Sequence, residues 1–326
     1  MLRALQAAWP QTRFTWIIGT AEHRLLGLVP EVEFISYDKR GGRGEWLRLR
    51  RLLRSRRFEL LLHLQLALRA SLLSRWVQAP VKLGFDRGRA RELQWLFTTD
   101  RIAAGGRQHV QDALYGFADA LGVPHAVPRW ELPLPEPARA SAARLTAGEP
   151  TLVISACSSH PLRNWNPAGY AALADHARRA HGLRVILCGA PNATERAMAA
   201  AIVAQARQPP IDHVGQDSLP ELVALLERAV AVLTPDSGPV HLATAVGTPV
   251  LGLYAATNPA RSGPYRRAEH CVDRYADAAR RFLGRSPEEL PWTTKLERPG
   301  VMDLITPAEV IAKLDGVLAG RGPKLG

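Results

Sequence analysis

One segment in the second half of the chain combines residue types that could bind phosphate. Residues 233–241 read Leu-Thr-Pro-Asp-Ser-Gly-Pro-Val-His, which predicts a buried strand, a tight turn at Gly238 and then a helix. The first amides of such a helix, with the positive end of its dipole, favour a bound phosphate. A carboxylate would repel phosphate there, so we expect Asp236 to bind a hydroxyl group or orient a neighbour. Alternatively, Asp236 or Ser237 only caps the helix and His241 packs against it.

A second segment, residues 155–165, also follows a predicted strand and precedes a capped helix. Its Ser158 and Ser159 supply hydroxyl donors, and Arg163 supplies a cation that could neutralise a diphosphate. The alternative is a polar surface loop with an incidental arginine. Glu195, which follows a further strand, could bind ribose hydroxyls or simply complement a helix dipole.

The sequence excludes several other kinds of site. Its three cysteines, Cys157, Cys188 and Cys271, are an odd and widely spaced set that predicts neither disulfides nor zinc and fits a reducing, cytoplasmic compartment. There is no G-x-G-x-x-G or G-x-x-x-x-G-K-[ST] motif and no Asp-x-Asp pair. We therefore predict no dinucleotide cofactor, no P-loop and no bound metal.

Positive charge is concentrated in the first half of the chain. The net charge is +12, and residues 1–145 carry 23 basic and 13 acidic side chains, whereas residues 146–326 carry 19 and 17. This asymmetry predicts an anionic partner for the first half, with Arg69, Arg87 and Arg91 among the candidate contacts. Ordinary solvated charge is the alternative. Nucleic-acid binding is disfavoured because the arginines are not interleaved with an aromatic platform.

Short apolar segments alternate with longer amphipathic ones, a pattern typical of α/β proteins with parallel sheets. A proline-rich stretch between residues 128 and 150 predicts a junction between two domains, 1–145 and 146–326. Capping boxes at Ser218 and Thr306 predict helix starts. The predicted strands are 13–18, 33–36 and 58–64 in the first half, and 151–155, 184–188, 231–234 and 250–254 in the second.

The segment 236–241, Asp-Ser-Gly-Pro-Val-His, resembles the nucleotide-sugar signature of the ADP-heptose:lipopolysaccharide heptosyltransferases, glycosyltransferase family 9. Ser158, Ser159, Arg163 and Trp165 fall where that family has phosphate-binding hydroxyls, a basic residue and a tryptophan. The resemblance covers nearly the whole chain and is most marked for the heptosyltransferase I type. It implies a GT-B fold, in which two Rossmann-like, doubly wound domains face each other across a cleft.

The resemblance also implies roles for particular residues. It assigns nucleotide-sugar binding to Ser158, Ser159, Arg163, Glu195, Asp217, Ser218, Leu219, Asp236, Ser237, Gly238, Pro239 and His241, of which Arg163, Asp236 and His241 are the expected catalytic residues. It assigns acceptor binding to Gln65, Arg69, Arg87, Arg91 and His109. His63 and Leu66 stand where the family commonly has Asp and Gly, so a different acceptor preference is expected.

The implied reaction is inverting, metal-independent transfer of heptose from ADP-L-glycero-D-manno-heptose to the Kdo/heptose inner core of lipopolysaccharide. A monomeric enzyme without a cofactor is expected, acting at the cytoplasmic face of the inner membrane. The family begins with a strand and a Gly-Asp-bearing loop that supplies a general base, and this chain starts after that loop, so we expect it to lack the first strand and to transfer poorly. The alternatives are an impaired nucleotide-sugar-binding homologue and a glycosyltransferase with another donor or acceptor.

Overall fold

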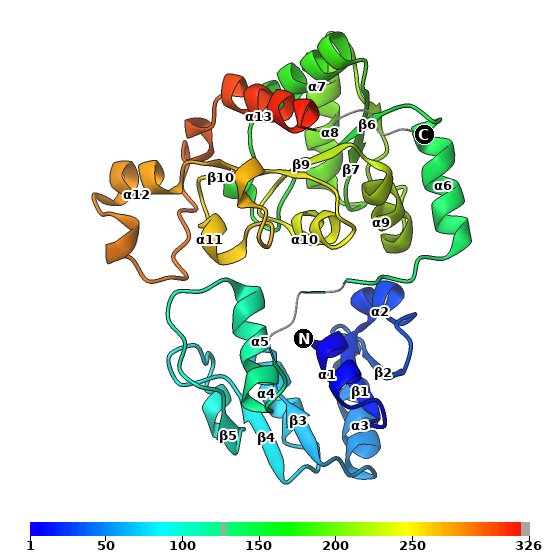
Figure 1. Ribbon diagram of the computed structural model, residues 1–326, viewed down its shortest axis with the longest axis vertical. Coiled ribbons are helices and arrows are strands. Elements are labelled where there is room, and N and C mark those ends of the chain that lie inside the picture. Colours follow the sequence, from blue (N-terminus) through cyan, green and yellow to red (C-terminus); the bar gives the residue numbers. More distant parts are fainter. Residues whose placement is uncertain (125–127, 129, 321–326) are drawn as a thin grey trace. The chain divides into compact units, whose positions relative to one another are not determined.

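The computed structural model describes residues 1–124, 128 and 130–320. The chain divides into two compact units, Met1–Arg129 and Trp130–Gly326 (Figure 1). Each unit has its own parallel strands and its own hydrophobic clusters, and the mixed α/β class predicted from the sequence is confirmed.

The predicted domain boundary, between residues 145 and 146, lies later in the chain than this division. Helix α6 (Glu136–Thr146) belongs to the second unit. Its Ala138 and Ala142 are buried in one hydrophobic cluster with Ala224 and Leu225 of α9 (Leu219–Arg228). The proline-rich stretch is therefore followed by a helix that packs on the second sheet, which the sequence pattern did not predict.

The second unit is built on one six-stranded parallel sheet. Its strands are β6 (Thr151–Ser155), β7 (Arg184–Cys188), β8 (Ile211–Asp212), β9 (Ala231–Pro235), β10 (Val250–Tyr254) and β11 (Val272–Asp273), in the order β11-β10-β9-β6-β7-β8. The remaining helices are α7 (Pro167–His181), α8 (Ala193–Gln205), α10 (Gly238–Ala245), α11 (Pro259–Ser262), α12 (Tyr275–Leu283) and α13 (Pro307–Ala319). This strand order is that of a doubly wound, Rossmann-like sheet.

Helices cover both faces of this sheet, because successive strand residues point to opposite sides. Leu152 and Ile154 of β6 belong to a cluster that includes residues of α7, α8, α12 and α13. Val153, between them, belongs to the cluster of α6, α9 and α10. The strands are consequently almost continuous runs of buried apolar residues, as expected for a parallel sheet covered on both sides.

The predicted helix starts in the second unit are confirmed. The Asn166 side chain accepts a hydrogen bond from the Gly169 N–H at 2.8 Å and caps α7, which ends at Gly182 with a left-handed φ of 64°. Ser218 and Thr306 each form a complete capping box, at the starts of α9 and α13. These local hydrogen bonds fix where each helix begins relative to the strand before it.

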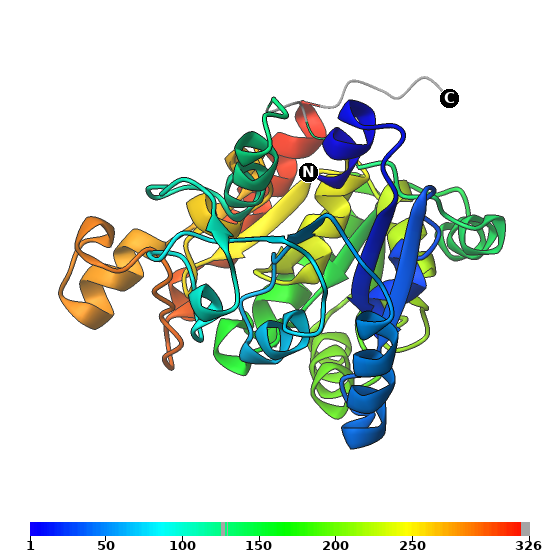
Figure 2. The ribbon, with the colours of Figure 1, turned by 90° about the horizontal axis from the view of Figure 1, so that it is seen from below.

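The first unit contains two separate small parallel sheets rather than one continuous doubly wound sheet. Its strands are β1 (Phe14–Gly19), β2 (Val32–Tyr37), β3 (Leu60–Leu62), β4 (Val81–Gly84) and β5 (Asp100–Arg101), and its helices are α1 (Leu2–Ala8), α2 (Thr20–Leu26), α3 (Gly42–Arg54), α4 (Leu68–Ser74) and α5 (Val110–Ala120). β1 pairs with β2, visible as dark blue arrows in Figure 2, and β3, β4 and β5 form the other sheet. The strand predicted over 58–64 is shorter than expected. The expectation that the chain lacks the family's first strand stays a prediction.

A buried glutamine joins three segments of the first unit. Gln94 is completely buried, donates from Nε2 to the backbone oxygens of His63 (2.8 Å) and Gln65 (3.0 Å), and accepts from the Phe85 N–H (3.2 Å). His63 is itself buried, with Nε2 at 3.2 Å from the Ser71 hydroxyl. His63 is therefore part of the core, and its side chain is not placed to influence acceptor choice by direct contact.

This burial predicts a pH dependence of stability. Burial, with a smaller contribution from the charge of Lys82, lowers the pKa of His63 from 6.5 to about 4. The unfolded chain takes up a proton at this histidine near pH 6.5, whereas the folded chain resists protonation until about pH 4. As the pH is lowered from 6.5 to 4, protonation of the unfolded chain destabilises the fold. We therefore expect chemical denaturation to show that the unfolding free energy of the wild type falls by about 3 kcal/mol more than that of His63→Gln over this range. Parallel pH profiles for the two proteins would contradict this.

Candidate functional site

The loops that follow β6 and β9 leave the sheet side by side. β6 and β9 are hydrogen-bonded neighbours, with Ile154 paired to Leu233. From β6 the chain winds to β7 and β8 on one side, then returns to β9 on the other, so the strand order reverses between β6 and β9. Crevices at such switch points, outside the carboxyl ends of the strands, are where doubly wound sheets bind ligands. The fold thus brings together the two segments that the sequence singled out.

The loop after β6 is held by its own polar side chains. The Ser158 N–H donates to Asn164 Oδ1 at 2.7 Å, and its hydroxyl donates to the His160 backbone oxygen at 3.0 Å. Ser159 is exposed. Trp165 is buried and donates from Nε1 to the Ile305 oxygen at 2.9 Å, so it anchors the end of the loop in the core. In this loop Ser159 is exposed to solvent, and Arg163 carries the positive charge that could meet a ligand.

Arg163 is fixed by a carboxylate that the sequence did not indicate. Its Nε donates to Glu297 Oε1 at 2.8 Å, its terminal amino group contacts the same oxygen, and its side chain is only 11% exposed. Burial acts to raise the Glu297 pKa, but hydrogen bonding and charge attraction from Arg163 outweigh burial and lower it. Because one carboxylate oxygen takes both contacts, the other terminal amino group of the guanidinium keeps its donors for a further partner.

Helix α10 begins directly after β9 with no side chain capping its amides. Ser237 stands at the N-cap position, but its hydroxyl lies 2.8 Å from the Thr234 hydroxyl instead of bonding the helix. Gly238 is the first helical residue and does not have a positive φ, so the predicted turn at Gly238 is wrong: the chain turns at Asp236 and Ser237. Pro239 carries no N–H, which leaves the Gly238 amide at the open end of the helix dipole.

The space on the Cβ side of Gly238 is open. A Cβ built at this position meets nothing within 4 Å. Asp236 is half-buried, and its charge adds to the effect of burial in raising the pKa of the neighbouring Tyr254. His241, in the first turns of α10, is exposed. The start of α10 is therefore an uncapped helix end with space for a ligand, flanked by a carboxylate and an imidazole.

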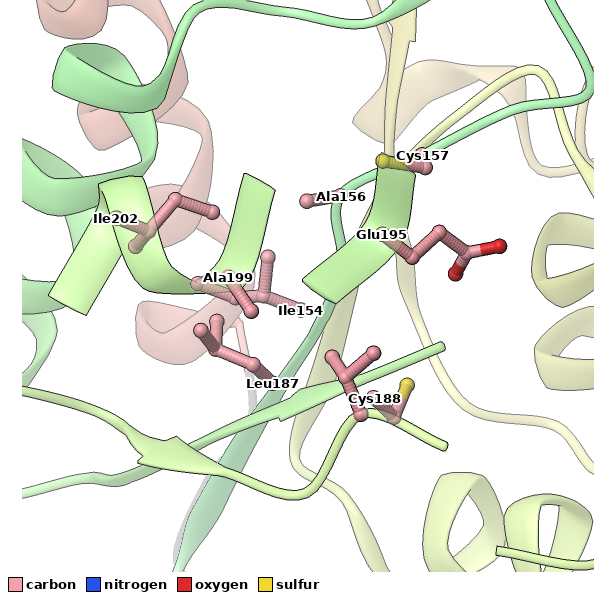
Figure 3. A pocket seen from close by; sticks show the side chains of 9 residues that line it. Ile154, Ala156, Cys157, Leu187, Cys188, Glu195, Ala199 and Ile202 are labelled. Carbon is pink, nitrogen blue, oxygen red and sulfur yellow. The ribbon is translucent and has the colours of Figure 1, made fainter. Parts of the chain in front are cut away.

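Glu195 stabilises the loop that precedes α8. Its carboxylate accepts from the Ala190 N–H at 2.7 Å and from Asn192 Nδ2 at 2.9 Å. A Cβ at Gly189 would lie 2.1 Å from Glu195 Oε2, so the glycine is needed for this arrangement. In Figure 3 the carboxylate points away from Ala199 and from the apolar end of a small cavity. That cavity, about 10 Å³, holds at most about one water and cannot be a nucleotide site.

Asp217 has one carboxylate oxygen that the fold leaves without a partner. Oδ1 lies 2.8 Å from His213 Nε2, whereas the buried Oδ2 has no hydrogen bond among the described residues. Burial, more than any charge, raises the Asp217 pKa. Ser218 is occupied by its capping box, and Leu219 is the first residue of α9. Of these three predicted residues, Asp217 has a carboxylate oxygen that can accept a hydrogen bond from a ligand.

The predicted acceptor residues all lie in the first unit. Gln65, Arg69, Arg87 and Arg91 are exposed, and the guanidinium of Arg87 lies 5.0 Å from the centre of the Trp95 ring. His109 is the N-cap of α5, where its Nδ1 accepts from the Gln111 N–H at 3.1 Å. The structure thus presents the arginines to solvent and gives His109 a structural role.

Sequence reasoning missed a third cluster of polar side chains. His176 and His181 each place Nε2 at 2.7 Å from Asp315 Oδ1 and so tie α7 to α13. This is the group in the described part of the chain with ligand atoms close enough to hold a metal ion. It lies at the C-terminal end of α7, far along the helix from the loop after β6. The sequence did contain a sign of this cluster, because His176 and His181 lie close together at the end of one predicted helix.

Comparison with known proteins places the chain in a family. Residues 46–290 match the family model glycosyltransferase family 9 (heptosyltransferase). The lipopolysaccharide core heptosyltransferase OpsX of Haemophilus influenzae is 38% identical over 96% of this chain and 90% of its own length. Lipopolysaccharide heptosyltransferase 1 of Pseudomonas aeruginosa is 28% identical over 80% of the chain and 75% of the relative.

Solved structures share the fold. The family 9 glycosyltransferase of Veillonella parvula superposes with a TM-score of 0.80 at 22% identity, covering 98% of this chain and 92% of that one. Escherichia coli heptosyltransferase WaaC, solved with ADP, gives a TM-score of 0.70 at 19% identity, with 97% and 93% covered. Together with the family match, these likenesses confirm the resemblance seen in the sequence. The chain belongs to glycosyltransferase family 9, the heptosyltransferases, and is a glycosyltransferase.

Proposed function

We propose that the second unit binds an ADP-activated heptose, and that the enzyme transfers the heptose, with inversion and without a metal ion, to the inner core of lipopolysaccharide. The observation that carries this proposal is the meeting of two loops at the β6/β9 switch point, one bearing Arg163 and the other the uncapped start of α10. A relative named as a lipopolysaccharide core heptosyltransferase, and a family structure solved with ADP, support the choice of donor and acceptor class.

The leaving diphosphate is stabilised by positive groups that are already in place. Arg163 is held by Glu297 before the ligand arrives, and the Gly238 amide lies at the positive end of α10. Donors that need no reorganisation stabilise the developing charge most effectively. Asp236 binds hydroxyl groups of the sugar, and His241 contacts a phosphate or supports the loop. A cation and helix amides replace the metal ion as the partner of the diphosphate.

The nucleoside end binds beyond β7 and β8. Asp217 Oδ2, which is buried and has no hydrogen-bond partner within the part of the chain that the structure describes, accepts from a hydroxyl or amino group of the adenosine. A ligand donor at this oxygen compensates for its desolvation, which otherwise destabilises the folded protein. Glu195, whose carboxylate already accepts two hydrogen bonds, has oxygen lone pairs left for a ribose hydroxyl.

The anionic acceptor binds the basic first unit, through Gln65, Arg69, Arg87 and Arg91, at the cytoplasmic face of the inner membrane. Residues 1–129 carry 21 basic and 11 acidic side chains. Guanidinium groups bind phosphate and carboxylate through paired hydrogen bonds, which suits a phosphorylated core bearing acidic sugars.

Calorimetry with ADP, UDP and GDP tests the donor, and product analysis with ADP-heptose and a Kdo-bearing lipid A acceptor tests the reaction. We expect ADP to bind at least about tenfold more tightly than the other two nucleotides, because Asp217 accepts from a polar group of the adenine base, whereas the ribose that Glu195 contacts is the same in all three. Binding and transfer should be unchanged by EDTA. Equal affinity for the three nucleotides, or transfer that EDTA abolishes, would overturn the corresponding part of the proposal.

A further inference from the structure

A group of exposed leucines in the first unit has no role in the donor site. Seven large hydrophobic side chains are strongly exposed among the described residues, and all of them lie in the first unit. Four of these are close in sequence and form what we call the leucine face: Leu68 (41% exposed), Leu72 (40%), Leu93 (53%) and Leu96 (59%). Exposed apolar patches of this kind, bordered by polar groups, mark interaction surfaces.

Hydrogen bonds hold the two halves of the leucine face against each other. Two of its leucines are one turn apart on α4; of the other two, Leu93 immediately precedes the short helix η1 (Gln94–Leu96) and Leu96 is its last residue. The Leu68 N–H, at the start of α4, donates to the Glu92 carboxylate. The buried Gln94 side chain donates to the backbone oxygen of Gln65, just before α4, at 3.0 Å. The η1 segment and the start of α4 therefore form one surface.

The backbone that presents this surface is strained. Glu92 and Leu93 are consecutive residues with φ of 46° and 61°, in the left-handed region that residues other than Gly, Asn and Asp seldom adopt. The fully buried Gln94 anchors the strained turn from within, while Leu93 stays outside the core. Strain of this kind persists where the surrounding structure enforces it, and it concentrates in functional segments.

Basic and aromatic side chains border the leucine face. Arg69 lies on α4 between its two leucines, and Arg91 immediately precedes the strained turn; both are exposed. Arg87 is exposed and stacks on Trp95, which lies within η1. An apolar surface surrounded by arginines, with a tryptophan at its margin, has the composition of a segment that lies in the interface of an anionic membrane.

We propose that the leucine face docks on the surface of a membrane rich in anionic lipid, with its leucines in the interfacial layer and the bordering arginines, which also bind the phosphorylated acceptor, at the level of the anionic headgroups. The inference rests on the proposed function, because a lipid-anchored acceptor requires the enzyme to work at a membrane surface. None of the helices in the described ranges has the length and apolar character needed to cross a bilayer. Docking of an exposed face is a form of attachment that needs no such helix.

Flotation with vesicles measures this docking. We expect the wild type to bind phosphatidylglycerol-containing vesicles, to bind pure phosphatidylcholine vesicles at least about tenfold more weakly, and to lose affinity as salt increases. The variant with Leu68, Leu72, Leu93 and Leu96 all changed to Gln should bind anionic vesicles at least about tenfold more weakly, with unchanged net charge. The control changes two exposed leucines elsewhere in the unit, Leu28→Gln and Leu47→Gln, and should bind as the wild type does.

A single substitution separates docking from folding. Asn tolerates the left-handed backbone of residue 93 better than Leu, so Leu93→Asn should have a thermal midpoint at or above that of the wild type while binding anionic vesicles less tightly. Wild-type vesicle binding by the four-leucine variant, or an equal loss in the Leu28/Leu47 control, would overturn the docking surface.

ADP affinity and heptose transfer, measured in the same proteins, test the proposed function separately from membrane docking. The four-leucine variant should keep wild-type ADP affinity and wild-type transfer to a water-soluble acceptor without acyl chains. Loss of that transfer would show that the leucines belong to the acceptor site and would overturn membrane docking as their role. Absence of ADP binding in the wild type would overturn the proposed donor, and the vesicle measurements would still decide the docking surface.

Discussion

Replacement of Arg163 by Ala is expected to lower kcat/KM for heptose transfer by a factor of about 10²–10³, the usual loss when one fixed donor to a developing negative charge is removed. The guanidinium lies in the loop that leaves the switch point beside β9, and Glu297 holds it there in the free enzyme. Steady-state transfer from ADP-heptose, with ADP affinity measured in parallel, gives the effect on the transition state and on binding. Arg163→Lys should recover part of the rate, because it restores the charge without the paired donors.

Two further variants distinguish a role in catalysis from a structural one. In Arg163→Ala, Glu297 loses its cation, so the double variant Arg163→Ala/Glu297→Gln removes that unpaired charge as well. If Arg163 acts on the diphosphate, the double variant stays as slow as the single one; recovery of the rate would show that the arginine only neutralises Glu297. As a control, Arg178→Ala removes an exposed ion pair between Arg178 of α7 and Glu149, which keeps Arg184 as a partner, and should transfer within about twofold of the wild type.

The second unit was largely predictable because its local signals agree with its tertiary structure. The strands 151–155, 184–188 and 250–254 were predicted with the bounds observed, since each is a short run of mainly apolar and almost entirely buried residues. Capping side chains defined the starts of α7, α9 and α13. Where propensity, burial and capping all favour the same element, sequence patterns locate it well.

The first unit was less predictable because its elements are short and its sheets small. β4 and β5 contain four and two residues, too few for a clear alternation of apolar and polar positions. The unit is stabilised instead by contacts between residues distant in sequence, above all the three hydrogen bonds of Gln94. In the sequence, nothing distinguishes this glutamine from a polar residue on the surface. The strained turn of the unit at Glu92 carries no glycine signal.

The sequence predicted which segments form the candidate donor site, but not which side chains hold those segments in place. Strand–loop–helix patterns are local, so the segments after β6 and β9 could be recognised. The partners that orient their side chains come from elsewhere: Glu297 is 134 residues from Arg163 along the chain. Such a contact depends on the folded path of the backbone, and neither residue carries a local sign of it.

Gly238 provides the sharpest test of where the diphosphate lies. Apart from its chain neighbours and its own helix, the protein leaves room for a side chain there, because φ is not positive and an added Cβ meets no other atom within 4 Å. Pro239, however, disfavours a helical backbone in any residue before it that carries a Cβ. In Gly238→Ala the higher helix propensity of Ala opposes the clash with Pro239, so the variant should fold with a stability within about 1 kcal/mol of the wild type. If a phosphate approaches the first amide of α10, however, the added methyl group occupies the space that the ligand needs. We expect calorimetry to show ADP affinity reduced about tenfold, and reduced further in Gly238→Val.

Gly316 supplies the matched control, because it too is helical, in α13, and a Cβ there also meets nothing within 4 Å. Gly316→Ala should show a thermal midpoint at or above that of the wild type, and wild-type ADP affinity. Gly316 differs from Gly238 in lying inside its helix and not before a proline, so the comparison uses ADP affinity, not stability: a loss of affinity in Gly238→Ala alone indicates a ligand close to the new methyl group. If Gly238→Val binds ADP as tightly as the wild type, the diphosphate does not lie on the start of α10. Arg163 would then have to hold it from the other side of the switch point, and the β6 loop alone would form the phosphate site.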